Sequence, residues 1–370
     1  MSFVEVHQGI EWSSIQRSIY AKNRQDVERA LVKERLDLED FKALLSPAAE
    51  HYLEPLAQRA YQLTRQRFGF TIGMYVPLYL SNLCSNACTY CGFSMENRLK
   101  RRTLTELEID AEIEVIKQMK FDNVLLVTGE HQNKVGMEYF RRVLPRIKKA
   151  FNYLSMEVQP LNQMDYQQLK QLGLDGVMVY QETYNPDTYA EHHLRGNKTD
   201  FNYRLDTPDR LAKAGIDKIG IGSLIGLEDW RTDCWFTAAH LDYLQGRYWQ
   251  SRYSISFPRL RPCTGGVQPK SLMNDKQLVQ TICAFRLLSP EVELSLSTRE
   301  SARFRNNLLP LGITSLSAGS KTQPGGYAME DVELEQFAIS DERSPREVEA
   351  MLRRQGFDPV WRDWQPCYSG

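Results

Sequence analysis

From about residue 71 to residue 322 the chain alternates short apolar runs with longer amphipathic segments, and no other feature restricts its fold as much. The amphipathic segments carry helix signals, such as the capping-box pattern of Thr105 and Glu108 before Ile109, Ile113 and Ile116 on one face. Eight apolar runs are candidate strands: 74–80, 123–128, 153–158, 176–180, 218–221, 253–257, 292–296 and 313–316. Eight strand-then-helix units over about 250 residues predict a (β/α)8 barrel, with its active site at the carboxyl ends of the strands.

An open doubly wound sheet is the alternative, because periodicity does not report whether a sheet closes. The first 70 residues read as helices, with Ser46-Pro47 as a helix start. After about Gln323 the chain is polar and irregular, with a short helix near 346–355. We therefore predict an α/β protein of three parts: an N-terminal helical extension (1–70), a TIM-type barrel (71–322) and a C-terminal tail packed on the barrel (323–370).

The charge balance argues against polyanionic partners. Lysine and arginine together number 46 and the acidic residues 47, which predicts no attraction to nucleic acid or to an anionic membrane. No stretch approaches the roughly 18 to 20 apolar residues of a membrane span, and the first residues lack a cationic-then-apolar signal region. We expect a cytoplasmic protein.

Three of the seven cysteines lie within eight residues, as Cys84-x3-Cys88-x2-Cys91 directly after the first candidate strand. Three thiolates can bind three corners of a [4Fe-4S] cluster and leave the fourth iron open, which suits catalysis. Zinc is the alternative, with a fourth ligand from His131, His192 or His193, because structural zinc sites close with four ligands. The scattered cysteines have no cysteine neighbours and are expected to be structural: Cys234, Cys263, Cys283 and Cys367.

The loop LCSNACTYCGF at 83–93 resembles the radical S-adenosylmethionine (SAM) superfamily. The resemblance implies two cofactors, a [4Fe-4S] cluster and SAM, whose amino and carboxylate groups bind the free iron. Transfer of one electron to SAM then releases methionine and a 5'-deoxyadenosyl radical. The resemblance also implies that Tyr90, inside the loop, is a cofactor-binding residue. The organic chemistry belongs to the cofactor, and the protein supplies burial and orientation.

Further positions at later strand ends match the superfamily. The segment around Glu130 resembles the glycine-glycine-glutamate segment that holds the SAM amino group, with Thr128 in place of the first glycine. Ser155 and Glu157 share one face of their strand by two-residue alternation and correspond to a strand end that contacts SAM. Arg204 resembles the arginine that meets the SAM carboxylate. An exposed strand-end glutamate and a surface salt bridge are the alternatives for Glu130 and Arg204.

Within the superfamily the chain is similar to the aromatic amino acid lyases, from about residue 20 to residue 365. The similarity lies in 75–84, 157–160, 178–184, 256–262 and 296–300. It is strongest to the tyrosine lyases of thiamine thiazole biosynthesis. It implies cleavage of L-tyrosine between Cα and Cβ to 2-iminoacetate (dehydroglycine) and p-cresol. The 5'-deoxyadenosyl radical is expected to take hydrogen from the substrate amine.

The resemblance also implies three substrate-site residues. Arg299 is the candidate clamp for the tyrosine carboxylate, since a guanidinium binds a carboxylate through two parallel hydrogen bonds. Ser317 would assist it, and Tyr79 would line the substrate. A structural arginine and a helix-capping serine are the alternatives, and Arg259 and Arg261 stay open between site and scaffold.

The family implies docking with thiazole synthase and a flavodoxin- or ferredoxin-type reductant. The related tyrosine lyase of hydrogenase maturation carries a second cluster on C-terminal cysteines. Here only Cys367 follows Cys283, so formation of carbon monoxide and cyanide is not expected. Two rivals remain: a biotin-synthase-like enzyme with another substrate, and a non-enzymatic iron-sulfur or zinc sensor.

Overall fold

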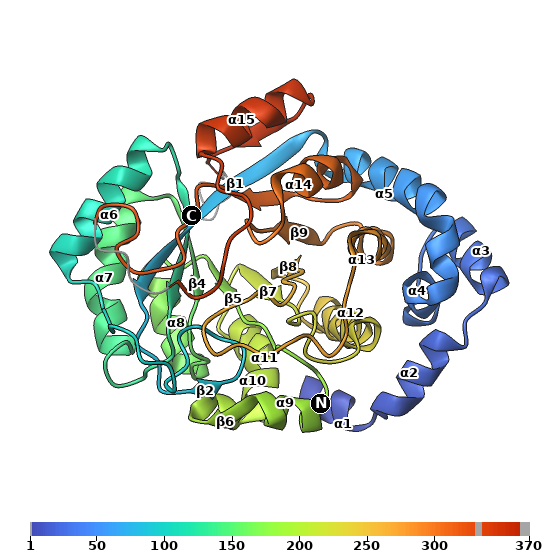
Figure 1. Cartoon of the computed structure of the whole chain (residues 1–370), viewed down its shortest axis with the longest axis horizontal. Helices are drawn as coiled ribbons and strands as arrows, with labels where there is room; N and C mark the ends of the chain where they lie inside the picture. Colours follow the sequence, from blue (N-terminus) through green and yellow to red (C-terminus); the bar gives the residue numbers. More distant parts are fainter. Residues whose placement is uncertain (1, 330–334, 363–370) are drawn as a thin grey trace.

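The computed structural model describes residues 2–329 and 335–362. Helices come first and form an arc along one side of the barrel (Figure 1). They are α1 (Phe3–Gln8), α2 (Trp12–Tyr20), α3 (Arg24–Val32), α4 (Leu38–Leu45), the 3-10 helix η1 (Pro47–Tyr52) and α5 (Leu53–Phe68).

Eight parallel strands follow and close on themselves. They are β1 (Thr71–Ser81), β3 (Asn123–Thr128), β4 (Tyr153–Glu157), β5 (Gly176–Met178), β7 (Lys218–Ile221), β8 (Arg252–Ser256), β9 (Glu293–Leu296) and β10 (Ser315–Ser317). Closure comes from β10 pairing with β1, where Gly73 lies opposite Ser315. The (β/α)8 barrel is confirmed, all eight strand predictions fall on these strands, and the open sheet is excluded.

The barrel is covered by helices whose apolar faces point inward. They are α6 (Glu106–Gln118), α7 (Met137–Ala150), α8 (Gln163–Gln171), α9 (Pro186–His192), α10 (Phe201–Leu205), α11 (Thr207–Lys213), α12 (Trp230–Arg247), α13 (Asp275–Leu288) and α14 (Ala302–Leu308). Thr105 caps α6 in the capping box that the sequence indicated. The remaining elements are the short strands β2 (Ala87–Cys88) and β6 (His193–Arg195), the 3-10 helices η2 (Asn197–Thr199) and η3 (Leu309–Leu311), and the C-terminal α15 (Pro345–Arg354) and β11 (Asp358–Val360), which pairs with the start of β1.

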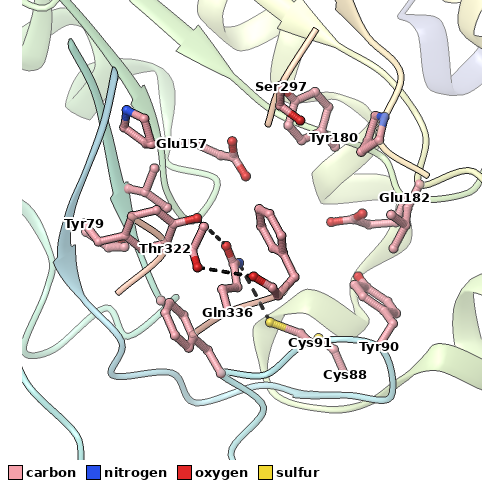
Figure 2. Close-up of a pocket in the computed structure, with 18 of the residues that line it drawn as sticks. Tyr79, Cys88, Tyr90, Cys91, Glu157, Tyr180, Glu182, Ser297, Thr322 and Gln336 are labelled. Carbon is pink, nitrogen blue, oxygen red and sulfur yellow. Dashed lines mark hydrogen bonds between the residues drawn. The ribbon is translucent and has the colours of Figure 1, made fainter. Parts of the chain in front are cut away.

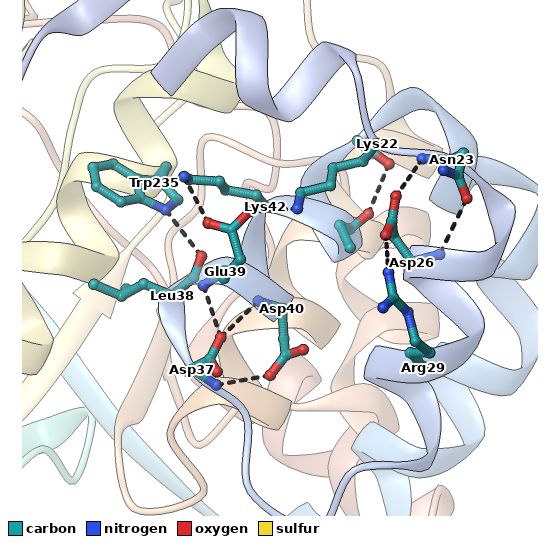
Figure 3. Close-up of polar contacts among 12 residues, drawn as sticks. Lys22, Asn23, Asp26, Arg29, Asp37, Leu38, Glu39, Asp40, Lys42 and Trp235 are labelled. Atoms are coloured by element: carbon teal, nitrogen blue, oxygen red, sulfur yellow. Dashed lines mark hydrogen bonds and ion pairs between the residues drawn. The ribbon is translucent and has the colours of Figure 1, made fainter. Parts of the chain in front are cut away.

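The N-terminal helices pack on α12 and α13. Phe41 of α4 meets Phe285 edge-on at 4.8 Å, and Trp235 donates its indole N–H to the carbonyl of Leu38 at 3.1 Å (Figure 3). A helix does begin at Pro47 as expected, but it is the 3-10 helix η1, and the Ser46 hydroxyl does not cap it: the hydroxyl donates back to the carbonyl of Ala43 at 2.7 Å. Apolar and polar contacts therefore both hold the N-terminal helices against α12 and α13.

The segment after β10 returns across the open end of the barrel. Buried Glu112 of α6 accepts the backbone N–H groups of Tyr327 and Ala328 at 3.1 and 2.6 Å. Further on, Ser340 donates its N–H to the carbonyl of Thr298 at 2.8 Å. The division of the chain at residues 70 and 322 stays a proposal.

None of the helices in the described part of the chain is long and apolar enough to cross a membrane.

Phe3 of helix α1 covers a buried histidine of α12, His240. The ring of Phe3 stacks on that of His240 at 3.8 Å, and His240 Nδ1 shares a hydrogen bond of 3.1 Å with the Tyr184 hydroxyl. Its Nε2 is buried without a partner among the described residues. Burial, with a smaller contribution from His7, lowers the pKa of His240 to about 3.

We expect acid to destabilise the folded chain through His240. The pKa of His240 is lower in the folded chain than in the unfolded one, so the unfolded chain binds the extra proton below about pH 6.5. The unfolding free energy should therefore fall between pH 7 and pH 5 by about 2 kcal/mol more in the wild type than in His240→Phe. Urea titrations of the metal-free protein at both pH values test this, and parallel pH dependences would contradict it.

Candidate active site

A cavity lies at the carboxyl ends of the barrel strands. Side chains from several strands or the turns after them face it: Tyr79, Val127, Glu157, Tyr180, Ser256 and Ser297. Figure 2 shows Glu157, Tyr180 and Glu182 around the space on one side and the cysteine loop on the other. This is the end at which (β/α)8 enzymes carry their active sites.

The three loop cysteines all line this cavity. Backbone contacts with later segments fix the loop: Cys88 lies opposite His193 in the β2–β6 pair, and Ser85 donates its N–H to the carbonyl of Glu130 at 2.9 Å. All three thiols are free of disulfides. Burial raises the pKa of each thiol, that of Cys91 to about 11, so metal binding must displace their protons.

This donor set fits a [4Fe-4S] cluster. Each of the three thiolates of such a cluster binds a different iron, so the sulfurs need not converge on one point. Across residues 2–329 and 335–362, no three His, Cys, Asp or Glu side chains gather closely enough to hold a single metal ion.

None of the histidines considered as a fourth zinc ligand lines the cavity with the three cysteines. Both ring nitrogens of His193 are engaged, Nε2 with the Tyr90 hydroxyl at 2.7 Å and Nδ1 with the Tyr189 carbonyl at 2.6 Å. His192 Nδ1 bonds the Thr89 hydroxyl at 2.6 Å, and His131 Nδ1 accepts the N–H of Lys134 at 3.3 Å. The rings of His192 and His193 thus hold side chains of the cysteine loop, and that of His131 accepts a backbone N–H further along its own segment.

A buried charge network faces the cysteines. Arg204 Nη1 lies 3.0 Å from Glu130 Oε1, and Asn86 Nδ2 donates to the other oxygen of Glu130 at 2.8 Å. Arg204 Nε donates to the Tyr180 carbonyl at 2.7 Å. Burial would raise the pKa of Glu130, but the cations Arg204 and Lys198 outweigh it and the pKa is lowered. Glu130 is therefore ionised, and neither side chain forms the surface contact that was the alternative.

Two members of this network were not predicted as site residues. Lys198, in η2, lies 2.6 Å from Glu182 Oε1, and Arg204 Nη2 lies 3.8 Å from the same oxygen. Glu182 stood in a recognised segment without a role, and its backbone has φ 72°, a conformation that costs energy in a non-glycine residue. This backbone conformation places the Glu182 carboxylate beside two cations, Lys198 and Arg204.

Two charged side chains in the cavity are uncommitted. The guanidinium of Arg299 makes no hydrogen bond or ion pair within the described ranges, and it lies 3.4 Å from the centroid of the Phe337 ring. The carboxyl group of Glu157 likewise has no hydrogen-bond partner there; burial and then Glu182 raise its pKa to about 7. A free guanidinium beside an aromatic face suits a carboxylate ligand.

The two predicted serines lie off the cavity wall. Ser155 is on the inward face of β4 but one layer deeper than Glu157, with its hydroxyl on the Val124 carbonyl at 3.4 Å. Ser317 accepts the N–H of Thr298 at 3.2 Å. Ser317 thus holds the turn that carries Arg299 and does not face the cavity.

Arg259 and Arg261, which were open between site and scaffold, have different surroundings, and the cysteines outside the loop differ as well. Arg259 pairs with Glu300 and with Asp275, at 2.9 Å to each, and belongs to the scaffold. Arg261 lines the cavity and donates to the Ser340 hydroxyl. Cys263 is not isolated: its thiol donates to the Tyr90 carbonyl at 3.1 Å. Cys234 and Cys283 are buried, and Cys367 lies outside the described residues.

Comparison with known proteins agrees with this geometry. The Radical SAM superfamily matches residues 78–233, and the Biotin and Thiamin Synthesis associated domain matches 256–358. The chain is 62% identical to the 2-iminoacetate synthase of Salmonella typhimurium, over 98% of this chain and 97% of that protein. It is 63% identical to the 2-iminoacetate synthase of Escherichia coli, over 96% and 94% respectively.

Among solved structures, HydG, a maturase of the [FeFe]-hydrogenase, superposes with a TM-score of 0.90 at 28% identity, covering 96% of this chain and 81% of that one. The barrel, the cysteine loop and near full-length identity above 60% lead to one assignment. The chain belongs to the 2-iminoacetate synthase family of radical SAM enzymes.

Proposed function

We propose that this chain cleaves L-tyrosine between Cα and Cβ to 2-iminoacetate and p-cresol, and converts SAM to 5'-deoxyadenosine and methionine. The 2-iminoacetate supplies the thiazole of thiamine diphosphate. One observation carries the proposal: three free cysteines and an uncommitted arginine line the same cavity. Relatives above 60% identity over almost the whole chain support the choice of substrate.

The residues divide into two binding sets. Cys84, Cys88 and Cys91 hold the [4Fe-4S] cluster, and the Glu130–Arg204 pair offers opposite charges to the ammonium and carboxylate of SAM. When both are bound, they supply the one-electron chemistry that starts the cleavage. Tyr90, Ser155 and Glu157 complete our proposed cofactor set, with Ser155 acting through the strand and not by contact.

Arg299 sets the position of the substrate. Its guanidinium binds the tyrosine carboxylate through two parallel hydrogen bonds, which fixes the amine and the Cα–Cβ bond relative to the cofactors. Tyr79 lines the substrate, and Ser317 supports the turn of Arg299. Glu157, with a pKa of about 7, exists in both protonation states near neutral pH and can donate or accept a hydrogen bond in the cavity.

The reaction needs partners. We propose a flavodoxin- or ferredoxin-type electron donor, delivery of the unstable imine to thiazole synthase in a complex, and a cytoplasmic location. The near-neutral charge of the chain is consistent with the absence of a nucleic-acid partner.

The decisive experiment is anaerobic reconstitution with iron and sulfide, followed by dithionite, SAM and tyrosine. We expect p-cresol that depends on tyrosine and on SAM. Abundant 5'-deoxyadenosine without p-cresol would favour a biotin-synthase-like enzyme with another substrate. A reduced, cluster-loaded protein that leaves SAM intact would favour the sensor.

Replacing Arg299 should weaken tyrosine cleavage more than SAM cleavage. We expect kcat/KM for p-cresol formation to fall about 30- to 150-fold in Arg299→Met, because a charged hydrogen-bonded contact of about 2–3 kcal/mol is lost. Arg299→Lys should recover only part, since a point charge cannot form the parallel bonds. Exposed Arg303, four residues further on, gives the control Arg303→Met with wild-type rates. Equal losses of p-cresol and 5'-deoxyadenosine would contradict the assignment.

A further inference from the structure

The segment 335–341 lies across the cavity and touches the cysteine loop. Gln336 accepts the backbone N–H of Gly92 at 3.1 Å and donates its own N–H to the Thr322 carbonyl at 3.0 Å. Thr322 also donates its hydroxyl to the Phe337 carbonyl at 3.2 Å. Figure 2 shows Gln336 between Tyr79 and Cys91, with its side chain directed at both.

This close approach depends on the glycine after the last loop cysteine. A Cβ at position 92 would lie 2.6 Å from the carbonyl oxygen of Gln336 and 2.7 Å from that of Glu335. Both obstacles are backbone atoms, so a side chain would push the segment away from the loop. Gly92 therefore permits a direct contact between the loop and residues more than 240 positions later.

The side chain of Gln336 makes two contacts of different kinds. Its Oε1 accepts the Tyr79 hydroxyl at 2.7 Å, and its Nε2 lies 3.9 Å from the sulfur of Cys91. When the cluster is bound, the orientation of the amide follows from chemistry, because a ligating Cys91 thiolate can only accept a hydrogen bond. The N–H group must therefore face the sulfur, and the oxygen faces the phenol.

We propose that Gln336 is a positioning residue that tunes the cluster through Cys91, with Tyr79 holding its amide in place. This rests on the cluster of the proposed function. A hydrogen bond to a ligand sulfur stabilises the more negative, reduced cluster and so makes its reduction potential less negative. Tyr79 fixes the amide oxygen, which keeps the two N–H bonds on the side of Cys91. The substrate wall and the cluster are thereby joined by one side chain.

The test is a redox titration of the reconstituted protein, followed by electron paramagnetic resonance without tyrosine. In Gln336→Leu the N–H donor is gone, and we expect a more negative midpoint potential and a changed spectrum. Gln336→Glu keeps an acceptor for Tyr79 but places a carboxylate near the sulfur, so it should shift the potential in the same direction. Tyr79→Phe should shift it less, because the N–H donor remains.

Gln323→Leu is the matched control: it makes the same change at a buried glutamine of the C-terminal segment that has no hydrogen bond to the cysteine loop. Its potential should equal that of the wild type. A wild-type potential in Gln336→Leu or Gln336→Glu, with full iron content and unchanged melting temperature, would overturn this inference and leave the proposed function standing. A wild type without any cluster signal would overturn the proposed function itself.

Discussion

Cys88→Ala is expected to lose its cluster and, with it, every trace of SAM cleavage and p-cresol formation. The three cysteines act as one unit, because a cluster held by two thiolates does not present the same open iron. Residues that work as a unit are strongly non-additive. Each single variant at Cys84, Cys88 or Cys91 should therefore be as inactive as the triple variant, at least about 1000-fold below the wild type.

Iron and sulfide content, the visible absorption of the cluster and both products measure this effect. Cys283→Ala is the control, because Cys283 is buried in α13 away from the cavity. That variant should lose at most about 1–2 kcal/mol of stability and keep its iron. A Cys88→Ala protein that still makes 5'-deoxyadenosine would rule out the cluster assignment.

The strands of the barrel were predictable because they differ from their surroundings in composition, and their number favoured a barrel. The apolar runs 123–128 and 218–221 coincide with β3 and β7, and the cysteine loop follows β1 as expected. Periodicity alone could not distinguish this closed barrel from an open sheet, since closure depends on the contact of Gly73 in β1 with Ser315 in β10, 242 residues apart. Local sequence restricts the elements, whereas the ends of the sheet meet only in the folded chain.

The two-residue alternation along β4 predicted which face of the strand a side chain lies on, but not how deep in the barrel it lies. Ser155 and Glu157 do share the inward face of β4, yet only Glu157 reaches the cavity. Inward side chains of a barrel stack in layers, so a shift of two residues along a strand moves a side chain to the next layer. The same reasoning explains Ser317, which is inside the barrel but below the turn of Arg299.

The residues that sequence reasoning missed come from irregular segments. Lys198 lies in a three-residue 3-10 helix within a polar stretch, and Gln336 in the C-terminal segment. Neither has periodicity or a motif that indicates a role. Their positions are set by tertiary contacts, Lys198 by Glu182 and Gln336 by the cysteine loop. Only Glu182 gave a signal, because it stood in a segment that resembled the family.

Four buried charges of the cavity form a connected set, and Arg204 is central to it. Its guanidinium contacts Glu130 and Glu182 and donates to the Tyr180 carbonyl, while Lys198 adds the second cation. Removing one partner of a buried ion pair leaves an uncompensated charge in a poorly solvated place. The cost of such a change exceeds the net contribution of the pair.

Arg204→Gln should therefore lower the unfolding free energy by about 3–5 kcal/mol and abolish SAM binding. Arg195→Gln is the control, since its ion pair with Glu96 is exposed and should contribute under about 1 kcal/mol. Denaturant titration of the metal-free protein measures stability, and calorimetry of the reconstituted protein measures SAM binding. In the double variant Arg204→Gln, Glu130→Gln the stranded carboxylate is gone, so stability should partly return while SAM binding does not. Recovery of both would mean that Arg204 and Glu130 serve the fold alone, and loss of neither in Arg204→Gln would remove the network from the site.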